Sequence, residues 1–115
     1  MSPVDAFVVA HDHARTLRST LASLAGQTQP PGRTVVVDNA STDGSVAVVE
    51  ELARTLPLEL HRFHENRGFA AAANDALRRT QAEWILALNP DCRLAPDYLA
   101  QLVAAVSGRE RVARR

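Results

Sequence analysis

Polar side chains that could bind a metal ion or a substrate follow three apolar runs of this 115-residue chain. Carboxylate oxygens are ligands that Mg²⁺ prefers in proteins. Asn-Pro and Asp are also common in ordinary turns, so the local sequence leaves open whether Asp91 closes a turn or binds a metal ion. The three groups are His11-Asp12-His13, Asp38-Asn39 and Asn89-Pro90-Asp91.

The segments that must position these groups are predicted to be strands and helices in alternation. Short β-type apolar runs indicate buried strands, and apolar residues at helical spacing, such as Leu17, Leu21 and Leu24, indicate amphipathic helices. Pro96 is expected to be the first residue of the last helix. The predicted strands are residues 4–10, 34–37, 58–63 and 83–88, and the predicted helices are residues 14–26, about 43–56, 69–80 and 96–106.

The β-α alternation predicts an α/β fold with a mostly parallel sheet and helices on both faces. The run at 58–63 is the most weakly patterned and is expected near an edge. Small side chains in the helix at 69–80 would let it lie close to the sheet. Its inward residues are expected to be Phe69, Ala72, Ala73, Ala76 and Leu77.

Composition excludes several classes of partner. Thirteen basic and thirteen acidic residues cancel, so no broad positive field favours nucleic acid or an anionic membrane. No apolar run approaches the roughly 20 residues of a transmembrane helix. The start of the chain lacks a signal-peptide pattern, and the single cysteine, Cys92, allows no internal disulfide. We therefore expect a cytoplasmic protein without a transmembrane segment.

Missing motifs narrow the function further. The chain contains neither the Gly-x-Gly-x-x-Gly fingerprint of dinucleotide-binding proteins nor a phosphate-binding P-loop. Acidic residues at successive strand ends also occur in receiver domains and in haloacid dehalogenase-type phosphatases. Both of these use a lysine near the phosphoryl group, whereas all thirteen basic residues here are arginine. An unrelated nucleotide-binding α/β domain stays open.

Three motifs in order resemble the nucleotide-sugar-binding half of family 2 glycosyltransferases, most closely the rhamnosyltransferase-like members. They are VVVDNASTDGS at residues 35–45, NRGFA at 66–70 and LNPD at 88–91. The likeness extends from Val4 to about Val106. It implies a GT-A, Rossmann-like fold with strand order 3-2-1-4.

The resemblance also implies residue roles. Ala10 and His11 stand where the first strand of the family ends in Thr-Tyr, whose ring packs on the nucleobase; here the ring is an imidazole. Asp38 and Asn39 stand at the acidic pair that reads the base. Gly68 and Asn74 lie where the donor diphosphate approaches a helix start, whose amides favour anions.

Asn89-Pro90-Asp91 occupies the position of the family's DXD motif, with an amide in place of the first acid. The resemblance therefore implies that Asp91 alone binds a divalent ion, Mg²⁺ or Mn²⁺. Such an ion neutralises the diphosphate leaving group. The family's general base follows this motif, in the acceptor-binding half, so no residue of this chain is assigned as the catalytic base.

Two functions follow as hypotheses. One is a glycosyltransferase domain, residues 1–107 followed by an Arg-rich tail at 108–115, whose nucleoside-diphosphate sugar is transferred with inversion to a saccharide or another hydroxyl acceptor. The alternative is a truncated or non-catalytic nucleotide-binding module. In either case a flank that an acceptor half would cover is expected to be exposed, which could drive self-association.

Overall fold

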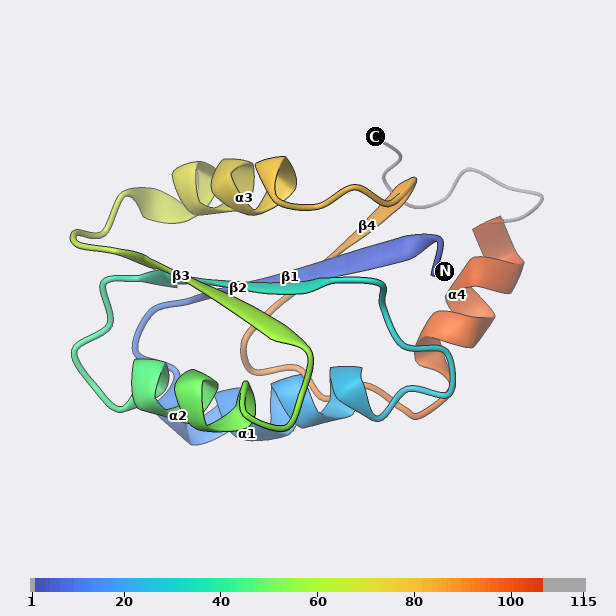
Figure 1. Ribbon diagram of the computed structural model, residues 1–115, viewed down its shortest axis with the longest axis horizontal. Coiled ribbons are helices and arrows are strands. Elements are labelled where there is room, and N and C mark those ends of the chain that lie inside the picture. The colour runs from blue at the N-terminus through green and yellow to red at the C-terminus, as the bar shows by residue number, and fades with distance from the viewer. Residues whose placement is uncertain (1, 107–115) are drawn as a thin grey trace.

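Figure 1 shows the computed structural model, which describes residues 2–106. Helices cover both faces of one central sheet: α1 and α2 lie on one face and α3 lies on the other. The expected tail at residues 108–115 lies outside the described residues. The elements are β1 (Val4–Ala10), α1 (Ala14–Ala25), β2 (Thr34–Asn39), α2 (Ser45–Leu52), β3 (Leu58–Phe63), α3 (Gly68–Arg78), β4 (Trp84–Leu88) and α4 (Tyr98–Val106).

The four strands form a parallel sheet in the order β3-β2-β1-β4, which confirms the predicted fold. Val8 of β1 pairs with Val36 of β2 on one side and with Leu88 of β4 on the other. β3 lies at an edge, as its weak apolar pattern predicted. Because all strands run in one direction, the segments that follow them meet at a single edge of the sheet.

The core has a large-residue face and a small-residue face. Leu17 and Leu21 of α1 are fully buried against Val36 and its neighbours. On the opposite face, Ala72 and Ala76 of α3 pack on Phe7, Val35 and Val37. Alanine side chains leave little distance between helix and sheet, so α3 lies close to the strands and its start is placed directly beside their carboxyl ends.

Asp5 ties the opposite edge of the sheet together. The residue is 3% exposed, and its carboxyl group accepts hydrogen bonds from the backbone N–H groups of Arg33 (2.8 Å), Gln81 (2.8 Å) and Ala82 (3.0 Å). A Cβ on Gly32 would lie 2.9 Å from Asp5 Oδ1, so glycine is needed for the chain to pass this carboxylate. The amino ends of β1, β2 and β4 are thereby held at one point.

The sequence predictions were wrong at the end of β2, at the start of α4 and for two residues of α3. β2 continues through Asp38 and Asn39, which lie inside the strand because both pair with β3. Phe69 and Leu77 are 62% and 37% exposed instead of inward, since only the alanine face of α3 meets the sheet. The last helix begins at Tyr98, after a turn in which Tyr98 N–H donates to Ala95 O (3.1 Å), and not at Pro96.

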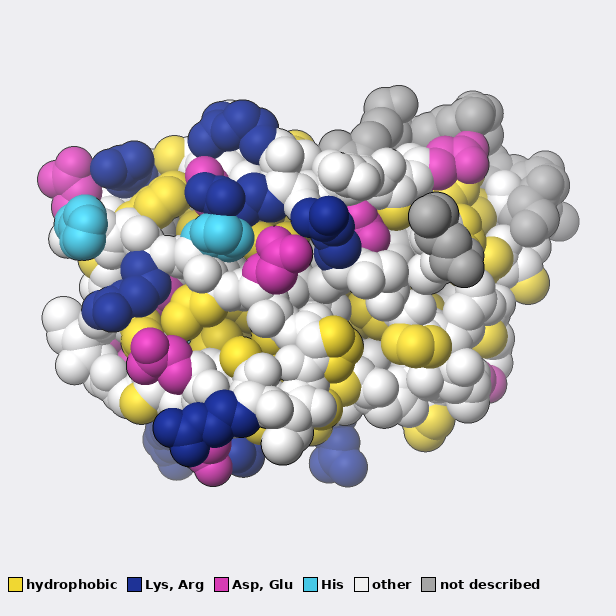
Figure 2. Space-filling model, viewed as in Figure 1, with side chains coloured by type: hydrophobic (Ala, Val, Ile, Leu, Met, Phe, Trp, Pro, Cys, Tyr) yellow, Lys and Arg dark blue, Asp and Glu magenta, His cyan; other side chains and the backbone are white. Residues whose placement is uncertain are grey.

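Arginine and acidic side chains are interspersed over the face shown in Figure 2. Arg18 pairs with Glu51 at 2.6 Å, and Arg33 lies 3.5 Å from Glu59. Opposite charges are thus neighbours on the surface as well as equal in number. Within residues 2–106, none of the helices has the length and apolar character needed to cross a membrane.

Candidate nucleotide site

The loops after β1 and β2 brace each other at the carboxyl edge of the sheet. Asp12 Oδ1 accepts hydrogen bonds from Thr42 N–H (2.7 Å) and Asp43 N–H (3.2 Å), while Asp12 N–H donates to the Ser41 hydroxyl (2.9 Å). Asp12 adopts a φ of 57°, which aspartate tolerates better than most residues. The loop after β1 is therefore held in place before any ligand arrives.

Asp43 closes this brace. Its Oδ2 accepts from Ala14 N–H at 3.1 Å, and its Oδ1 accepts from the Ser45 hydroxyl at 2.5 Å and from Ser45 N–H at 2.8 Å. The Ser45 hydroxyl is the main cause that lowers the pKa of the Asp43 carboxyl below its usual value. Asp43 therefore stays ionised and holds the first turns of both α1 and α2.

Asp38 is buried and its carboxylate is occupied within the protein. It is 2% exposed, and its two oxygens accept from the Ser41 N–H (2.9 Å) and the Ser41 hydroxyl (2.6 Å). These bonds close a tight turn in which Ala40 takes a φ of 62°. A left-handed conformation costs a residue such as alanine roughly 1–2 kcal/mol. The hydrogen bonds between Asp38 and Ser41 offset this strain.

Asn39 joins β2 to the start of α3. Its Oδ1 accepts from Arg67 N–H (2.9 Å) and its Nδ2 donates to Gly68 O (3.1 Å). Gly68 has a φ of 85°, a conformation that glycine adopts without strain. The Arg67 guanidinium stacks on the Phe63 ring, 4.7 Å from its centre. Asn39 thus sets where the amino end of α3 lies.

Two histidines have their tautomers set by the backbone. The Nδ1 atom of His11 lies 2.8 Å from Asn39 O, which can only accept, so this nitrogen carries the proton. His13 Nδ1 accepts from His11 N–H at 3.0 Å, so a neutral His13 carries its proton on Nε2. The neutral rings therefore offer one acceptor, His11 Nε2, and one donor, His13 Nε2–H.

These groups surround a cavity of about 350 Å³ at the carboxyl edge of the sheet. Of the residues predicted for the nucleotide, the structure brings His11, Asn39 and Gly68 together in its wall. Ala10 and Asp38 are buried and do not belong to its wall, and Asn74 is exposed further along α3. The other wall residues are Val9, His13, Asn66, Phe69, Leu88, Asn89 and Pro90.

The sequence interpretation placed Phe69 in the core, and it named His13 among the polar residues after the first strand without assigning it to the nucleotide. Phe69 was assigned to the core because it falls on the alanine face at helical spacing, but α3 begins at Gly68 and the ring lies beyond the sheet. The signal that could have identified it is its place directly after Asn66-Arg67-Gly68, which predicts a loop-to-helix junction. His13 carried no distinguishing signal, because alternate histidines in a loop are usually solvated.

Asp91 lies in the turn after β4, next to the cavity wall. Cys92 N–H donates to Asn89 O (3.2 Å) and closes this turn, and Pro90 lines the cavity. The Asp91 side chain is exposed, and within the described part of the chain its carboxylate accepts no hydrogen bond. No group of three or more potential metal ligands occurs among residues 2–106. Asp91 can therefore offer one carboxylate to an ion whose other ligands come from elsewhere.

A parallel α/β sheet with a cavity at its carboxyl edge is an architecture in which ligands bind beyond the carboxyl ends of the strands. The family comparison defines the chain more narrowly: residues 5–113 match the model of glycosyl transferase family 2, and the chain belongs to that family. This confirms the resemblance that the three sequence motifs carried.

Known relatives and structures agree with this assignment. The chain is 30% identical over 104 residues to the uncharacterized glycosyltransferase YfnE of Bacillus subtilis. The alignment covers 90% of this chain and 26% of YfnE. The S. aureus TarS 1-349 complex with UDP-GlcNAc superposes with a TM-score of 0.83 at 26% identity, covering 93% of this chain and 31% of that one.

A second solved structure is the mannosyltransferase PcManGT from Pyrobaculum calidifontis in complex with GDP-Man and Mn²⁺. It has a TM-score of 0.81 and 34% identity, and the match covers 89% of this chain and 33% of that one. The chain thus spans about a quarter to a third of the length of the proteins it resembles.

Proposed function

We propose that the cavity at the carboxyl edge of the sheet binds the nucleotide of a nucleoside-diphosphate sugar, the donor of a glycosyl transfer. The observation that carries this proposal is the convergence of the His11 ring, the Asn39 clamp and the start of α3 on one cavity. Support comes from the similar structures, which hold UDP-GlcNAc and GDP-Man. Different nucleobases in these relatives leave the base of this donor to experiment.

Within this proposal, His11 lies along the base, and the exposed Phe69 ring offers a second apolar surface. The edge of the base faces His13 Nε2–H, which is a donor. Asn39 acts by holding residues 67–68, since both ends of its amide are engaged. The diphosphate lies toward Gly68, because helix N-terminal amides stabilise anions by roughly 0.3–1 kcal/mol.

Asp91 is proposed as the protein ligand of Mg²⁺ or Mn²⁺. The residues present fit such an ion, because Asp91 is exposed and both carboxylate oxygens are available among the described residues. Mg²⁺ is commonly held by one or two carboxylates together with substrate phosphates and water. When bound, the ion neutralises charge on the leaving diphosphate. Mn²⁺ in the similar mannosyltransferase structure supports this assignment.

Transfer with inversion to a saccharide or another hydroxyl acceptor is the proposed reaction of the whole protein. A general base must take the acceptor proton, and no described side chain beside the cavity is assigned that role. The alternative is a module that binds the nucleotide without transferring the sugar. A transfer assay with UDP-GlcNAc and GDP-Man distinguishes the glycosyltransferase from the binding module. Turnover by the 115-residue chain alone would require a general base within it.

The direct test is titration calorimetry of the chain with UDP, TDP and GDP, each with and without Mn²⁺. We expect one of them to bind, and its affinity to rise when Mn²⁺ is present. Substituting His11→Ala should weaken binding with and without the ion, because the ring belongs to the base site. Absence of binding by all three nucleotides would refute the donor-site proposal.

A further inference from the structure

Helix α1 presents a polar stripe beside its apolar stripe. Its members are spaced by four, three and four positions, so they share one side of the helix and its end. Two of them are nearly inaccessible: Thr20 is 1% exposed and Gln27 is 5% exposed. We define the polar stripe of α1 as Thr16, Thr20, Ser23 and Gln27.

Every member of the polar stripe bonds to the backbone of residues 90–99. The Thr16 and Thr20 hydroxyls both lie 2.9 Å from Pro90 O, the carbonyl that directly precedes Asp91. Thr20 has a second acceptor, Thr16 O, at 3.1 Å. Two donors therefore converge on the peptide group that carries the proposed metal ligand.

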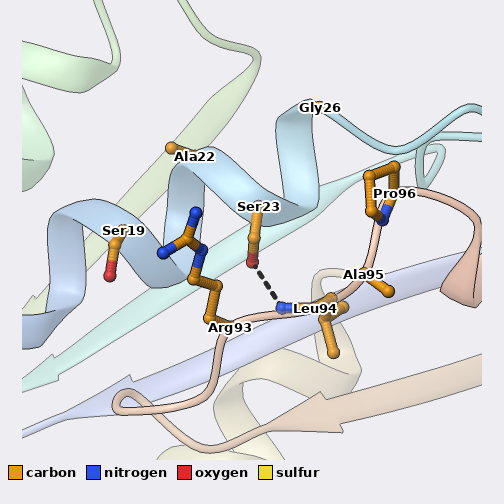
Figure 3. Close-up of a pocket in the computed structure, with 8 residues that line it drawn as sticks. All are labelled: Ser19, Ala22, Ser23, Gly26, Arg93, Leu94, Ala95 and Pro96. Carbon is orange, nitrogen blue, oxygen red and sulfur yellow. Dashed lines mark hydrogen bonds between the residues drawn. The ribbon is translucent and has the colours of Figure 1, made fainter.

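The rest of the stripe holds the segment that follows. Ser23 Oγ accepts from Leu94 N–H at 3.1 Å, as the dashed line in Figure 3 shows. Gln27 Nε2 donates to Ala95 O (2.7 Å), and its Oε1 accepts from Leu99 N–H (2.9 Å). The carboxamide thus spans the turn that leads into α4.

Side-chain packing alone does not fix this segment. Cys92 and Leu94 pack against the core, whereas Asp91 and Arg93 are exposed, so alternate side chains face outward. Residues 93–96 and α1 line a groove of about 610 Å³, and Figure 3 shows the Arg93 side chain extending from this segment toward α1. Hydrogen bonds from the polar stripe therefore set the register of the segment.

We propose that Thr16 and Thr20 are positioning residues, which hold Pro90 so that Asp91 faces the ion and the donor diphosphate. This inference rests on the proposed function of Asp91. Mg²⁺ demands near-ideal coordination geometry, and a displacement of about 1 Å in a positioned group has large effects on activity. The hydroxyls act through the Pro90 peptide and touch neither substrate nor metal.

The test compares Thr16→Val/Thr20→Val with the wild-type chain in titrations of UDP or GDP, whichever the wild type binds, with and without Mn²⁺. Valine keeps the side-chain shape and removes both hydroxyl donors. We expect metal-free affinity to stay within about twofold, and the affinity gained from Mn²⁺ to fall about tenfold. Thr16→Ser/Thr20→Ser retains the hydroxyls and should restore the gain.

Ser19→Ala is the matched control, because among residues 2–106 the Ser19 hydroxyl donates only to Thr16 O of its own helix (3.3 Å). An equal gain from Mn²⁺ in wild type and the valine variant would overturn the positioning role while the proposed function stands. A parallel loss of metal-free affinity would also overturn it, since the stripe would then support the whole fold. No gain in the wild type would refute the metal site itself. Should the double variant fail to fold, Thr20→Val alone provides the comparison.

Discussion

Carboxylates at the two edges of the sheet are held in opposite ways. At the amino edge, Asp5 is 3% exposed and accepts from three backbone N–H groups. At the carboxyl edge, Asp91 is exposed and accepts from no group in the described part of the chain. Asp38 shares the edge of Asp91 but resembles Asp5, because Ser41 occupies its oxygens. A position at a strand end is therefore not enough for a carboxylate to bind an ion. Its oxygen atoms must also be free of hydrogen bonds within the protein.

The largest expected effect is on stability, from Asp5→Asn. The substitution turns one carboxylate oxygen into an N–H₂ group that faces a backbone N–H, and it leaves a buried donor unpaired. Because hydrogen bonds to charged groups contribute about 1.5–3 kcal/mol each, we expect a loss of about 3 kcal/mol in the free energy of unfolding. Urea unfolding followed by circular dichroism measures this change.

Glu50→Gln is the control for Asp5, since it makes the same chemical change at an exposed position of α2. Surface substitutions of this kind change stability by about 0.5 kcal/mol or less. Equal unfolding midpoints for Asp5→Asn and wild type would contradict the role of Asp5 as the tie of the amino edge.

A smaller loss is expected from Asp38→Ala, about 2 kcal/mol, because two bonds to Ser41 are removed in a buried turn. Ser41→Ala removes only the hydroxyl bond and should cost about 1 kcal/mol. Titrating both variants with nucleotide tests whether the Asp38 carboxylate, unlike that of Asp91, has only a structural role. If Asp38 acts only by holding Ser41, both variants weaken binding by similar factors when they are compared at equal folded fraction.

A different result would restore the role that the family resemblance implied. Should Asp38→Ala lose far more nucleotide affinity than Ser41→Ala at equal folded fraction, Asp38 would contact the base directly. The carboxylate would then exchange its Ser41 bonds for ligand bonds on binding. The two variants thus decide between a structural and a base-reading carboxylate.

Asp91→Asn is expected to leave the free energy of unfolding within about 0.5 kcal/mol of wild type, since its carboxylate makes no hydrogen bond within residues 2–106 that could be lost. The same substitution should abolish the increase in nucleotide affinity that Mn²⁺ provides. Asp97→Asn is the matched control, an exposed acid of the same segment that bonds to Gln101 (2.5 Å). Retained metal dependence in Asp91→Asn would remove Asp91 from the metal site.

Much of the fold was predictable from the sequence because the β-α alternation repeats four times with little interruption. Strands β1 and β3 begin and end where their apolar runs do. Element ends were harder, because hydrogen-bond pairing between strands decides them. Asp38 and Asn39 look like loop residues, yet pairing with β3 extends β2 through both.

The candidate site was predictable only in part. Chain order placed His11 and Asn39 at one edge of the sheet, and the family resemblance added Gly68. The structure brings all three to one cavity. What the side chains already bond to could not be predicted, because it depends on loop conformations such as the left-handed Ala40. Such contacts occupy the amide of Asn39 and the carboxylate of Asp38. They also leave the Phe69 ring exposed.

The smallest expected effect concerns Asp43, an exposed carboxylate that is nevertheless engaged. The Ser45 hydroxyl and neighbouring N–H groups lower its pKa in the folded protein below the reference value of 3.8. A lowered pKa contributes stability that is present above the unfolded-state value and is lost as the pH falls through the folded-state value. Asp43→Asn should therefore flatten the decline in stability below about pH 4. Urea midpoints measured from about pH 5 to about pH 2 give this slope, and identical acid limbs for the two proteins would show that the loop brace does not depend on the Asp43 charge.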